Sequence, residues 1–98
     1  MSELLIAEAA EEEYAVSLQW YAQRSKNAAE RFEAEFAEAL EAIEAKPERY
    51  PVCDDGRHRF YLLKRYPFQL IYRKTDDGQW LIVAVAHTSR KPNYWSRR

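Results

Sequence analysis

The segment RHRFYLLKRYPFQLIYRK, residues 57–74, alternates weakly between apolar and polar side chains, and WLIVAVAH follows at residues 80–87. Alternation is typical of a half-buried β-strand, whereas a short run that is apolar throughout suits a strand covered on both faces. Pro67 should lie at a strand start or in a turn, because proline has no backbone N–H to donate. Asp77 and Gly78 form a hairpin signal between the last two runs. The predicted antiparallel strands are residues 57–64, 68–73 and 80–86.

Two stretches before this segment carry apolar side chains at the spacing of an α-helix. The first extends from about Ala9 to Arg24, and the second ends before Pro47, which stops a helix. Ser25 or Asn27 is expected to cap the start of the second helix. The apolar faces are Ala10, Tyr14, Leu18 and Tyr21 in the first helix, and Ala29, Phe32, Phe36, Leu40 and Ile43 in the second.

The run Leu4-Leu5-Ile6 is short and apolar, and it predicts an edge strand. Together these elements predict an α+β fold, in which an N-terminal helical hairpin packs on a small antiparallel β-sheet. Because 98 residues leave room for one hydrophobic core, we expect residues 1–98 to form a single domain. The hydrophobic content of 47% is that of a folded protein.

The charge is divided unequally between the two halves of the chain. Residues 1–46 hold eleven Glu against four cations, a net charge of −7, and residues 47–98 hold eleven Lys and Arg against five carboxylates, a net of +6. A basic sheet half of this kind can present a positive surface to nucleic acid or to an acidic protein partner.

Several classes of site and location are disfavoured by the sequence. The single cysteine, Cys53, cannot form an internal disulfide, and beside Asp54 and Asp55 it has no positive neighbour that would activate its thiol. The two glycines, Gly56 and Gly78, do not make a phosphate-binding loop, and no spacing of His, Cys or Asp indicates a metal, so no cofactor is expected. No run approaches the roughly 20 apolar residues of a membrane helix, and the N-terminus lacks the pattern of a signal peptide. We therefore expect a cytoplasmic protein.

Several short motifs occur in order along most of the chain. They are Trp20-Tyr21, Ala28-Ala29-x-x-Phe32, Pro47-x-x-Tyr50-Pro51, Tyr66-Pro67-Phe68-x-Leu70-Ile71-Tyr72-Arg73, Val83-Ala84-Val85-Ala86-His87 and Arg90-x-Pro92-x-Tyr94-Trp95. In this order the chain resembles small toxins of the RelE/ParE superfamily, the toxic halves of bacterial type II toxin-antitoxin pairs and plasmid stabilisation systems. The resemblance implies the same fold and, as partner, a cognate antitoxin protein with an acidic or amphipathic tail.

The resemblance implies one of two activities. One branch cuts messenger RNA on the ribosome, whereas the ParE branch inhibits DNA gyrase and has no nuclease chemistry of its own. Nuclease members place an arginine directly before a Leu-Val-Tyr-like triplet, where this chain has Gln69, and another after the last strand, where the first arginine is delayed to Arg90. Tyr94 does match their terminal tyrosine. The departures favour gyrase inhibition, with a ribosome-dependent endoribonuclease as the alternative and a non-toxic homologue that acts as a binding module as a third reading.

If the chain were a nuclease, acid–base and cationic groups would be needed around the phosphate. The candidate catalytic residues are His87, Tyr94 and Arg90, with Arg65 and Arg73 as further cations. Each has a structural alternative, because His87 can bond to backbone at a strand end, and Tyr94 and Trp95 can fold back to pad the helices.

Binding to the antitoxin or the target is expected to use the basic half. The candidate residues are Arg57, Arg59, Lys64, Arg65, Arg73, Arg90 and Trp95, although charges on exposed strands also protect a sheet from edge aggregation. A disordered antitoxin segment is expected to fold into a groove between helices and sheet, with its carboxylates meeting Arg59, Arg73 and Arg90. His58, between two arginines, is expected to be a surface strand residue.

Overall fold

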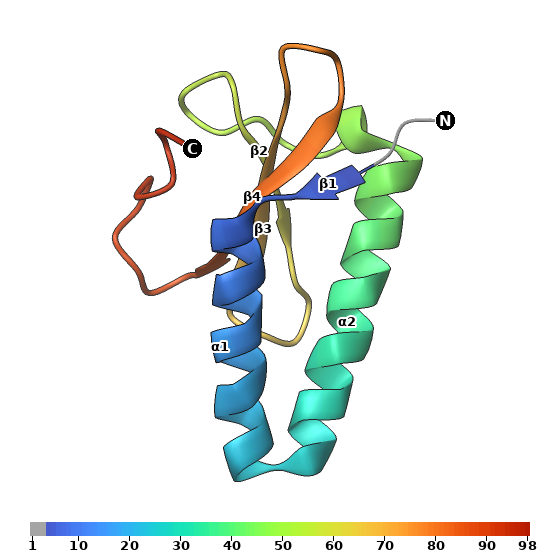
Figure 1. The fold of residues 1–98 in the computed structure, drawn as a ribbon, viewed down its shortest axis with the longest axis vertical. Coiled ribbons are helices and arrows are strands. Elements are labelled where there is room, and N and C mark those ends of the chain that lie inside the picture. The colour runs from blue at the N-terminus through green and yellow to red at the C-terminus, as the bar shows by residue number, and fades with distance from the viewer. Residues whose placement is uncertain (1–3) are drawn as a thin grey trace.

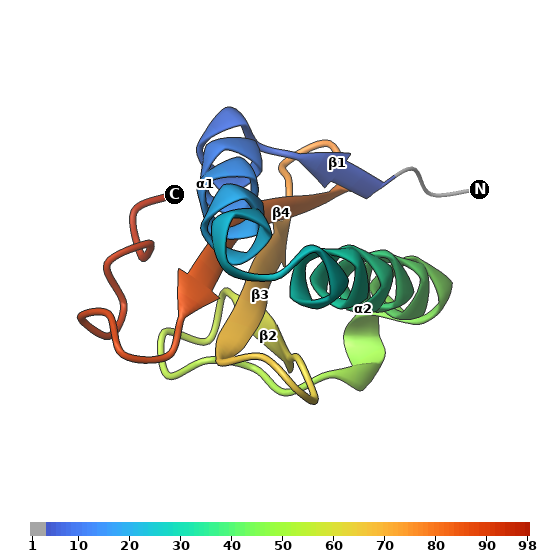
Figure 2. The same ribbon diagram turned by 90° about the horizontal axis from the view of Figure 1, so that it is seen from below.

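The computed structural model describes residues 4–98 and contains two helices and four strands (Figure 1). The elements are β1 (Leu4–Ile6), α1 (Glu8–Arg24), α2 (Lys26–Ala45), a short 3-10 turn η1 (Pro47–Arg49), β2 (Arg59–Leu62), β3 (Phe68–Lys74) and β4 (Trp80–His87). The helical hairpin covers one face of the sheet, and the tail, residues 88–98, passes over the other side (Figure 2). The predicted α+β fold is therefore confirmed. None of the helices in residues 4–98 is long and apolar enough to cross a membrane.

The sheet has the strand order β1-β4-β3-β2. β2, β3 and β4 form the predicted antiparallel meander, and Pro67 lies in the turn before β3. β1 lies at an edge as expected, but it pairs with β4 in parallel, so the sheet is mixed. This pairing continues into the start of α1, because the N–H of Ala7 donates to the carbonyl of Ile82 at 2.9 Å. β1 therefore sets the position from which α1 crosses β4.

Both faces of β4 are covered, as its uninterrupted apolar run predicted. The pairing with β3 is irregular, since Ile71 lies opposite Ala84 while Tyr72 lies opposite Ile82, which leaves Val83 as an extra residue on β4. Such a bulge shifts the alternation of side chains by one position. Ile82 and Val85 consequently pack with the helices, whereas Val83, Ala84 and Ala86 join Ile71 and Trp95 in a second cluster on the opposite face.

Ser25 is the single residue between the two helices, and it caps the end of α1 and the start of α2. Its N–H donates to the carbonyl of Tyr21 at 2.8 Å, which caps α1, and its Oγ accepts from the N–H of Ala28 at 3.1 Å, which caps α2. Ser25, and not Asn27, is therefore the N-cap of the second helix. A one-residue connection forces the helices to lie antiparallel, as predicted.

His58 is not at the surface, so that prediction was wrong. The side chain is 0% exposed and lies 5.0 Å from the ring of Trp95, centre to centre. The predicted strand is shorter than expected, because residues 53–58 form a loop in which the Asp55 carboxylate lies 2.6 Å from the His58 Nδ1. Burial raises the pKa of Asp55, but hydrogen bonds from the backbone N–H groups of His58 and Arg57, and from the His58 ring, lower it to about 2.

The same loop holds the thiol of Cys53 in an unreactive form. Burial, followed by the charges of Asp55 and Asp54, raises the pKa of Cys53 to about 11. Only the thiolate is a strong nucleophile, so little of it is present at neutral pH. This agrees with the expectation that Cys53 has no chemical role.

Replacing Asp55 with Ala should lower the free energy of unfolding at neutral pH by about 1–3 kcal/mol, because the buried His58 ring loses its acceptor. The folded-state pKa of about 2 lies below the unfolded value of about 3.9. The ionised carboxylate therefore stabilises the fold above about pH 4, and this contribution is lost as the pH falls toward 2. Chemical denaturation across this interval should show the difference from the wild type shrinking.

The control is Asp54→Ala, which removes the exposed carboxylate next in the chain. A deficit in Asp55→Ala that stays constant as the pH falls would contradict the assigned role.

Candidate functional site

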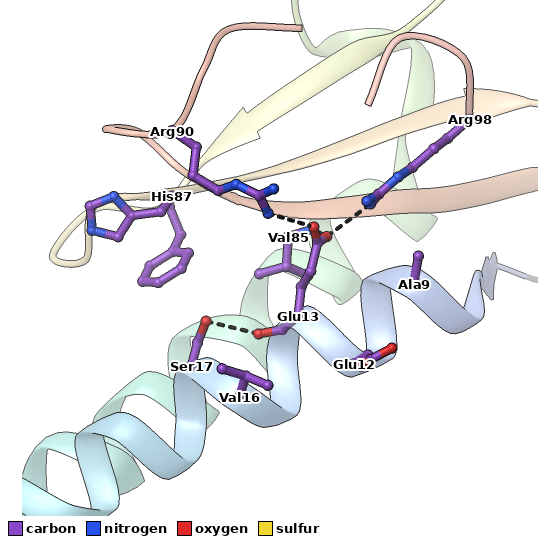
Figure 3. Close-up of a pocket in the computed structure, with 10 residues that line it drawn as sticks. Ala9, Glu12, Glu13, Val16, Ser17, Val85, His87, Arg90 and Arg98 are labelled. Carbon is purple, nitrogen blue, oxygen red and sulfur yellow. Dashed lines mark hydrogen bonds and ion pairs between the residues drawn. The ribbon is translucent and has the colours of Figure 1, made fainter. Parts of the chain in front are cut away.

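A groove runs along α1, on the side away from α2. Two adjoining hollows of about 430 and 490 Å³ share four lining residues, Val16, Ser17, Phe68 and His87. They therefore form one continuous surface, and Figure 3 shows its charged end. α1 makes one wall of the groove, and the end of β4, the turn before β3 and the tail make the other.

α1 carries a second stripe of side chains that does not belong to the core. One face of the helix packs Tyr14 and Tyr21 against α2 and the sheet, as predicted. The second stripe is Ala9, Glu13, Val16 and Trp20, at spacings of four, three and four, which place side chains on one face of a helix. Val16 is 63% exposed and Trp20 51%. The sequence analysis missed this stripe because it assigned only one face to the helix, although the spacing was visible.

Glu13 is the most connected side chain of the groove, and only 15% of its side-chain surface is exposed. Its Oε1 accepts from the N–H of Val85 at 3.0 Å and from Nη1 of Arg98 at 3.1 Å. Its Oε2 accepts from the hydroxyl of Tyr94 at 2.8 Å and from Nη1 of Arg90 at 3.2 Å. Figure 3 shows the two arginines reaching Glu13 from the tail. One carboxylate of α1 thus binds the tail and the edge of β4 together.

The β4 edge is open to Glu13 because β1 is short. β1 pairs only with residues 80–82 of β4, so α1 and the tail cover the edge beyond them. The Glu13 carboxylate accepts a hydrogen bond from the N–H of Val85, and Nη1 of Arg98 donates to the carbonyl of Val83 at 3.1 Å. Buried backbone groups need such partners. These side chains therefore replace a neighbouring strand.

Tyr94 and His87, two of the candidate catalytic residues, are engaged in intramolecular contacts. Burial, then the hydrogen bond to Glu13 and its charge, raise the pKa of Tyr94 to about 12. A phenol held in this way is a poor general base at neutral pH. His87 lines the groove, but its Nδ1 accepts from the N–H of Ser89 at 3.0 Å, and its ring packs edge-on against Phe68. This is the strand-end arrangement expected as its structural alternative.

Arg90, the third candidate, stacks on the ring of Tyr94 with its guanidinium carbon 3.7 Å from the ring centre. It therefore joins Glu13 and Tyr94 in one cluster, and it also lines the groove with His87. The structure brings His87, Tyr94 and Arg90 to the same end of the molecule. Each of them, however, has an intramolecular hydrogen-bond partner, and they do not converge on a shared substrate site.

A sequence model of the ParE toxin of the type II toxin-antitoxin system parDE matches residues 4–92. The chain belongs to this ParE toxin family. The match extends from β1 to just beyond Arg90 and so includes α1 and most residues that line the groove, while Tyr94, Trp95 and the groove residue Arg98 lie outside it. A search of curated protein sequences gives no significant match. The resemblance to the RelE/ParE superfamily is thus confirmed, and the chain is the toxin of a type II pair, with a cognate antitoxin as partner.

The predicted binding cations of this ParE-family toxin are dispersed over the structure. Arg59 donates to the carbonyl of Tyr50 at 2.7 Å, and Nε of Arg73 donates to the carbonyl of Arg98 at 2.9 Å. The backbone N–H groups of Lys64 and Arg65 donate to the carboxylate of Glu35 on α2. These contacts hold loops and the tail in place. A joint role of these cations in binding therefore stays a prediction.

Two further members of the predicted set lie away from the groove. Arg57 is exposed in the loop before β2. Trp95 is only 4% exposed, because it packs on Ile71, Val83 and the two small residues Ala84 and Ala86. It covers the sheet face opposite the helices, so it does not pad them as the structural alternative supposed. Of the seven predicted binding residues, all within the described chain, Arg90 is the one that lines the groove.

Replacing Glu13 with Gln should release the tail, because it removes the charge on which Arg90 and Arg98 converge. We expect the free energy of unfolding to fall by about 1–3 kcal/mol and trypsin to cleave after Arg90 and Arg97 several times faster. Limited proteolysis followed by mass spectrometry measures the rate. Glu12→Gln is the matched control, since Glu12 is the exposed neighbour in the same groove. Equal cleavage rates in the two variants would show that Glu13 does not hold the tail.

Proposed function

We propose that this toxin acts by binding and inhibiting DNA gyrase, and not by catalysis of its own. The observation that carries the proposal is the hydrogen bond from the Tyr94 hydroxyl to Glu13, which leaves the terminal tyrosine with a pKa of about 12. A nuclease needs a group that accepts the proton of the attacking hydroxyl. The other candidate base, His87, already accepts a hydrogen bond at Nδ1 from the N–H of Ser89, so this nitrogen is not free to take a proton from the substrate. Neither Tyr94 nor His87 is therefore arranged as the base of a nuclease.

Gln69 gives independent support. It lies on β3 opposite Ala86 and Leu62, and it lines a small hollow with His87, Arg90 and Tyr94. In the nuclease branch, as the resemblance implies, an arginine occupies this position. Cleavage of RNA concentrates negative charge on the phosphate, and a neutral amide stabilises that charge less well than a guanidinium. At this position, in the same hollow as the candidate catalytic residues, the chain therefore lacks the arginine that the nuclease branch places there.

The proposal predicts inhibition of purified gyrase. Addition of the wild-type chain at micromolar concentration should reduce supercoiling of relaxed plasmid and should cause DNA cleaved by gyrase to accumulate. Heat-denatured chain is the control, because it keeps the composition and charge but loses the folded surface. Normal supercoiling without trapped cleavage complexes would reject gyrase as the target.

One observation favours ribosome-dependent endoribonuclease activity as the second candidate function. His87, Arg90 and Arg98 line the same end of the groove, so a potential base and two cations are close together. Under that alternative, induction would produce cleavage of messenger RNA that depends on translation, and His87→Ala and Tyr94→Phe would abolish it. Growth arrest without such cleavage favours the gyrase proposal.

A further inference from the structure

We propose that this toxin binds the phosphate backbone of duplex DNA between α2 and the turn that joins β2 to β3, and that the Glu35 carboxylate fills this site in the free protein. The inference deepens the proposed function and rests on it, because gyrase acts on DNA, so DNA is present at the target. The site is a hollow of about 260 Å³, and none of the described residues that line it lines the groove beside α1. Its charged lining residues are Arg31, Glu35, Glu38, Lys64 and Arg65.

Two consecutive backbone N–H groups form the anion-binding part of the site. The N–H groups of Lys64 and Arg65 both donate to Oε1 of Glu35, the second at 2.9 Å. Backbone N–H groups are common ligands of nucleic-acid phosphates, because they direct a hydrogen bond at an anion. The turn therefore binds an anion already, and in the free protein this anion is a side chain of α2.

Three cations surround this carboxylate. Arg31 lies on α2 one helical turn before Glu35, whereas Lys64 and Arg65 belong to the turn. All three are exposed, and none of them takes part in an ion pair within residues 4–98. A guanidinium can bind two phosphate oxygens at once, and a lysine adds a point charge. The cations of this hollow are therefore available to a partner, unlike those that hold the loops and the tail.

Glu35 competes with a phosphate for the same N–H groups. With Glu35 and Glu38 ionised, the hollow holds three positive and two negative side chains, which leaves a net charge of only +1. When Glu35 turns into the solvent, its charge moves away and both N–H groups become free. Phosphate oxygens can accept these two hydrogen bonds and also contact the arginines. A DNA backbone gains further from the release of its condensed counterions, which a carboxylate within the protein does not.

The turn keeps its shape without Glu35. The hydroxyl of Tyr66 donates to the carbonyl of Ala28 on α2 at 2.7 Å. The N–H of Leu63 donates to the carbonyl of Phe68 at 2.9 Å, and the Leu63 side chain is buried in the core. These contacts fix the turn at both of its ends, so a variant without the Glu35 carboxylate is expected to fold and to present the same two N–H groups.

The affinity for DNA distinguishes a competing carboxylate from a purely structural one. Binding of the full chain to a short fluorescent DNA duplex is measured by anisotropy at low salt, and circular dichroism melting establishes that each variant folds. Glu35→Ala should bind several times more tightly than the wild type. Glu44→Ala is the matched control, since Glu44 is exposed nine residues further along α2, on the opposite side of the helix. If Glu35→Ala binds no more tightly than Glu44→Ala, the proposal is overturned.

Removal of a cation from the hollow should have the opposite effect. Arg65→Gln should weaken binding to the duplex several-fold, and the slope of log affinity against log salt should fall by about one, as expected for the loss of one phosphate contact. The control is Arg57→Gln, which neutralises an exposed arginine in the loop before β2. Equal losses in the two variants would show that only the total charge matters, and would overturn the site.

The backbone N–H groups offer a direct readout in the wild-type chain. In NMR spectra, the amide resonances of Lys64 and Arg65 should shift when the duplex is added, whereas that of Gly78, in the turn between β3 and β4, should not. A polyglutamate peptide tests an acidic protein segment as the other occupant. If the peptide shifts the two amides and the duplex does not, the proposal of a DNA site is overturned.

The outcomes for DNA and for gyrase can be told apart, because DNA binding is measured without the enzyme. Duplex binding that is tightened by Glu35→Ala and weakened by Arg65→Gln supports the DNA site, even if gyrase is not inhibited. Inhibition of gyrase by a chain that does not bind the duplex, either as wild type or as Glu35→Ala, supports the proposed target and overturns the DNA site.

Discussion

The Glu13 carboxylate is the interaction on which the arrangement of the functional surface depends. Hydrogen bonds to a charged acceptor are stronger than those between neutral groups, and here four donors converge on one nearly buried side chain. Removing the charge would leave Arg90 and Arg98 without their common partner inside a structure that partly excludes water. Glu13 therefore joins three parts of the chain that are distant in sequence: α1, the edge of β4 and the tail.

The groove and the tail follow from two local features of β4. Because β1 is short, the C-terminal half of the β4 edge is left to α1, which brings Glu13 to Val85. The bulge at Val83 turns Ala84 and Ala86 to the outer face, where their small side chains leave room for Trp95. The tail is anchored at both points, so it forms a fixed wall of the groove. The net charge of +6 in residues 47–98 is not gathered into one patch, because several of its cations hold the loops and the tail.

Helix faces and the antiparallel meander could be predicted because they depend on periodicity within short segments. The sequence could not predict the parallel pairing of β1, the bulge in β4 or the contacts of Glu13, because these join residues that are far apart in sequence. In addition, nothing in the local sequence distinguishes Glu13 from the other glutamates of the same helix. The position of His58 was predicted wrongly because the partner of its buried ring, Asp55, is supplied by a loop conformation and not by strand alternation. The second stripe of α1 was different, because the spacing of Val16 and Trp20 in the sequence was sufficient to identify it.

A double-mutant cycle between Glu13 and Arg98 tests the central claim most directly. The free energy of unfolding would be measured for the wild type, Glu13→Gln, Arg98→Gln and the double variant. Because the two side chains are in contact at 3.1 Å and partly buried, the account predicts a coupling of about 1 kcal/mol or more. The exposed pair Glu12 and Arg97 should give a coupling near zero. A coupling near zero for Glu13 and Arg98 as well would contradict the account, because the tail would then be held without the carboxylate.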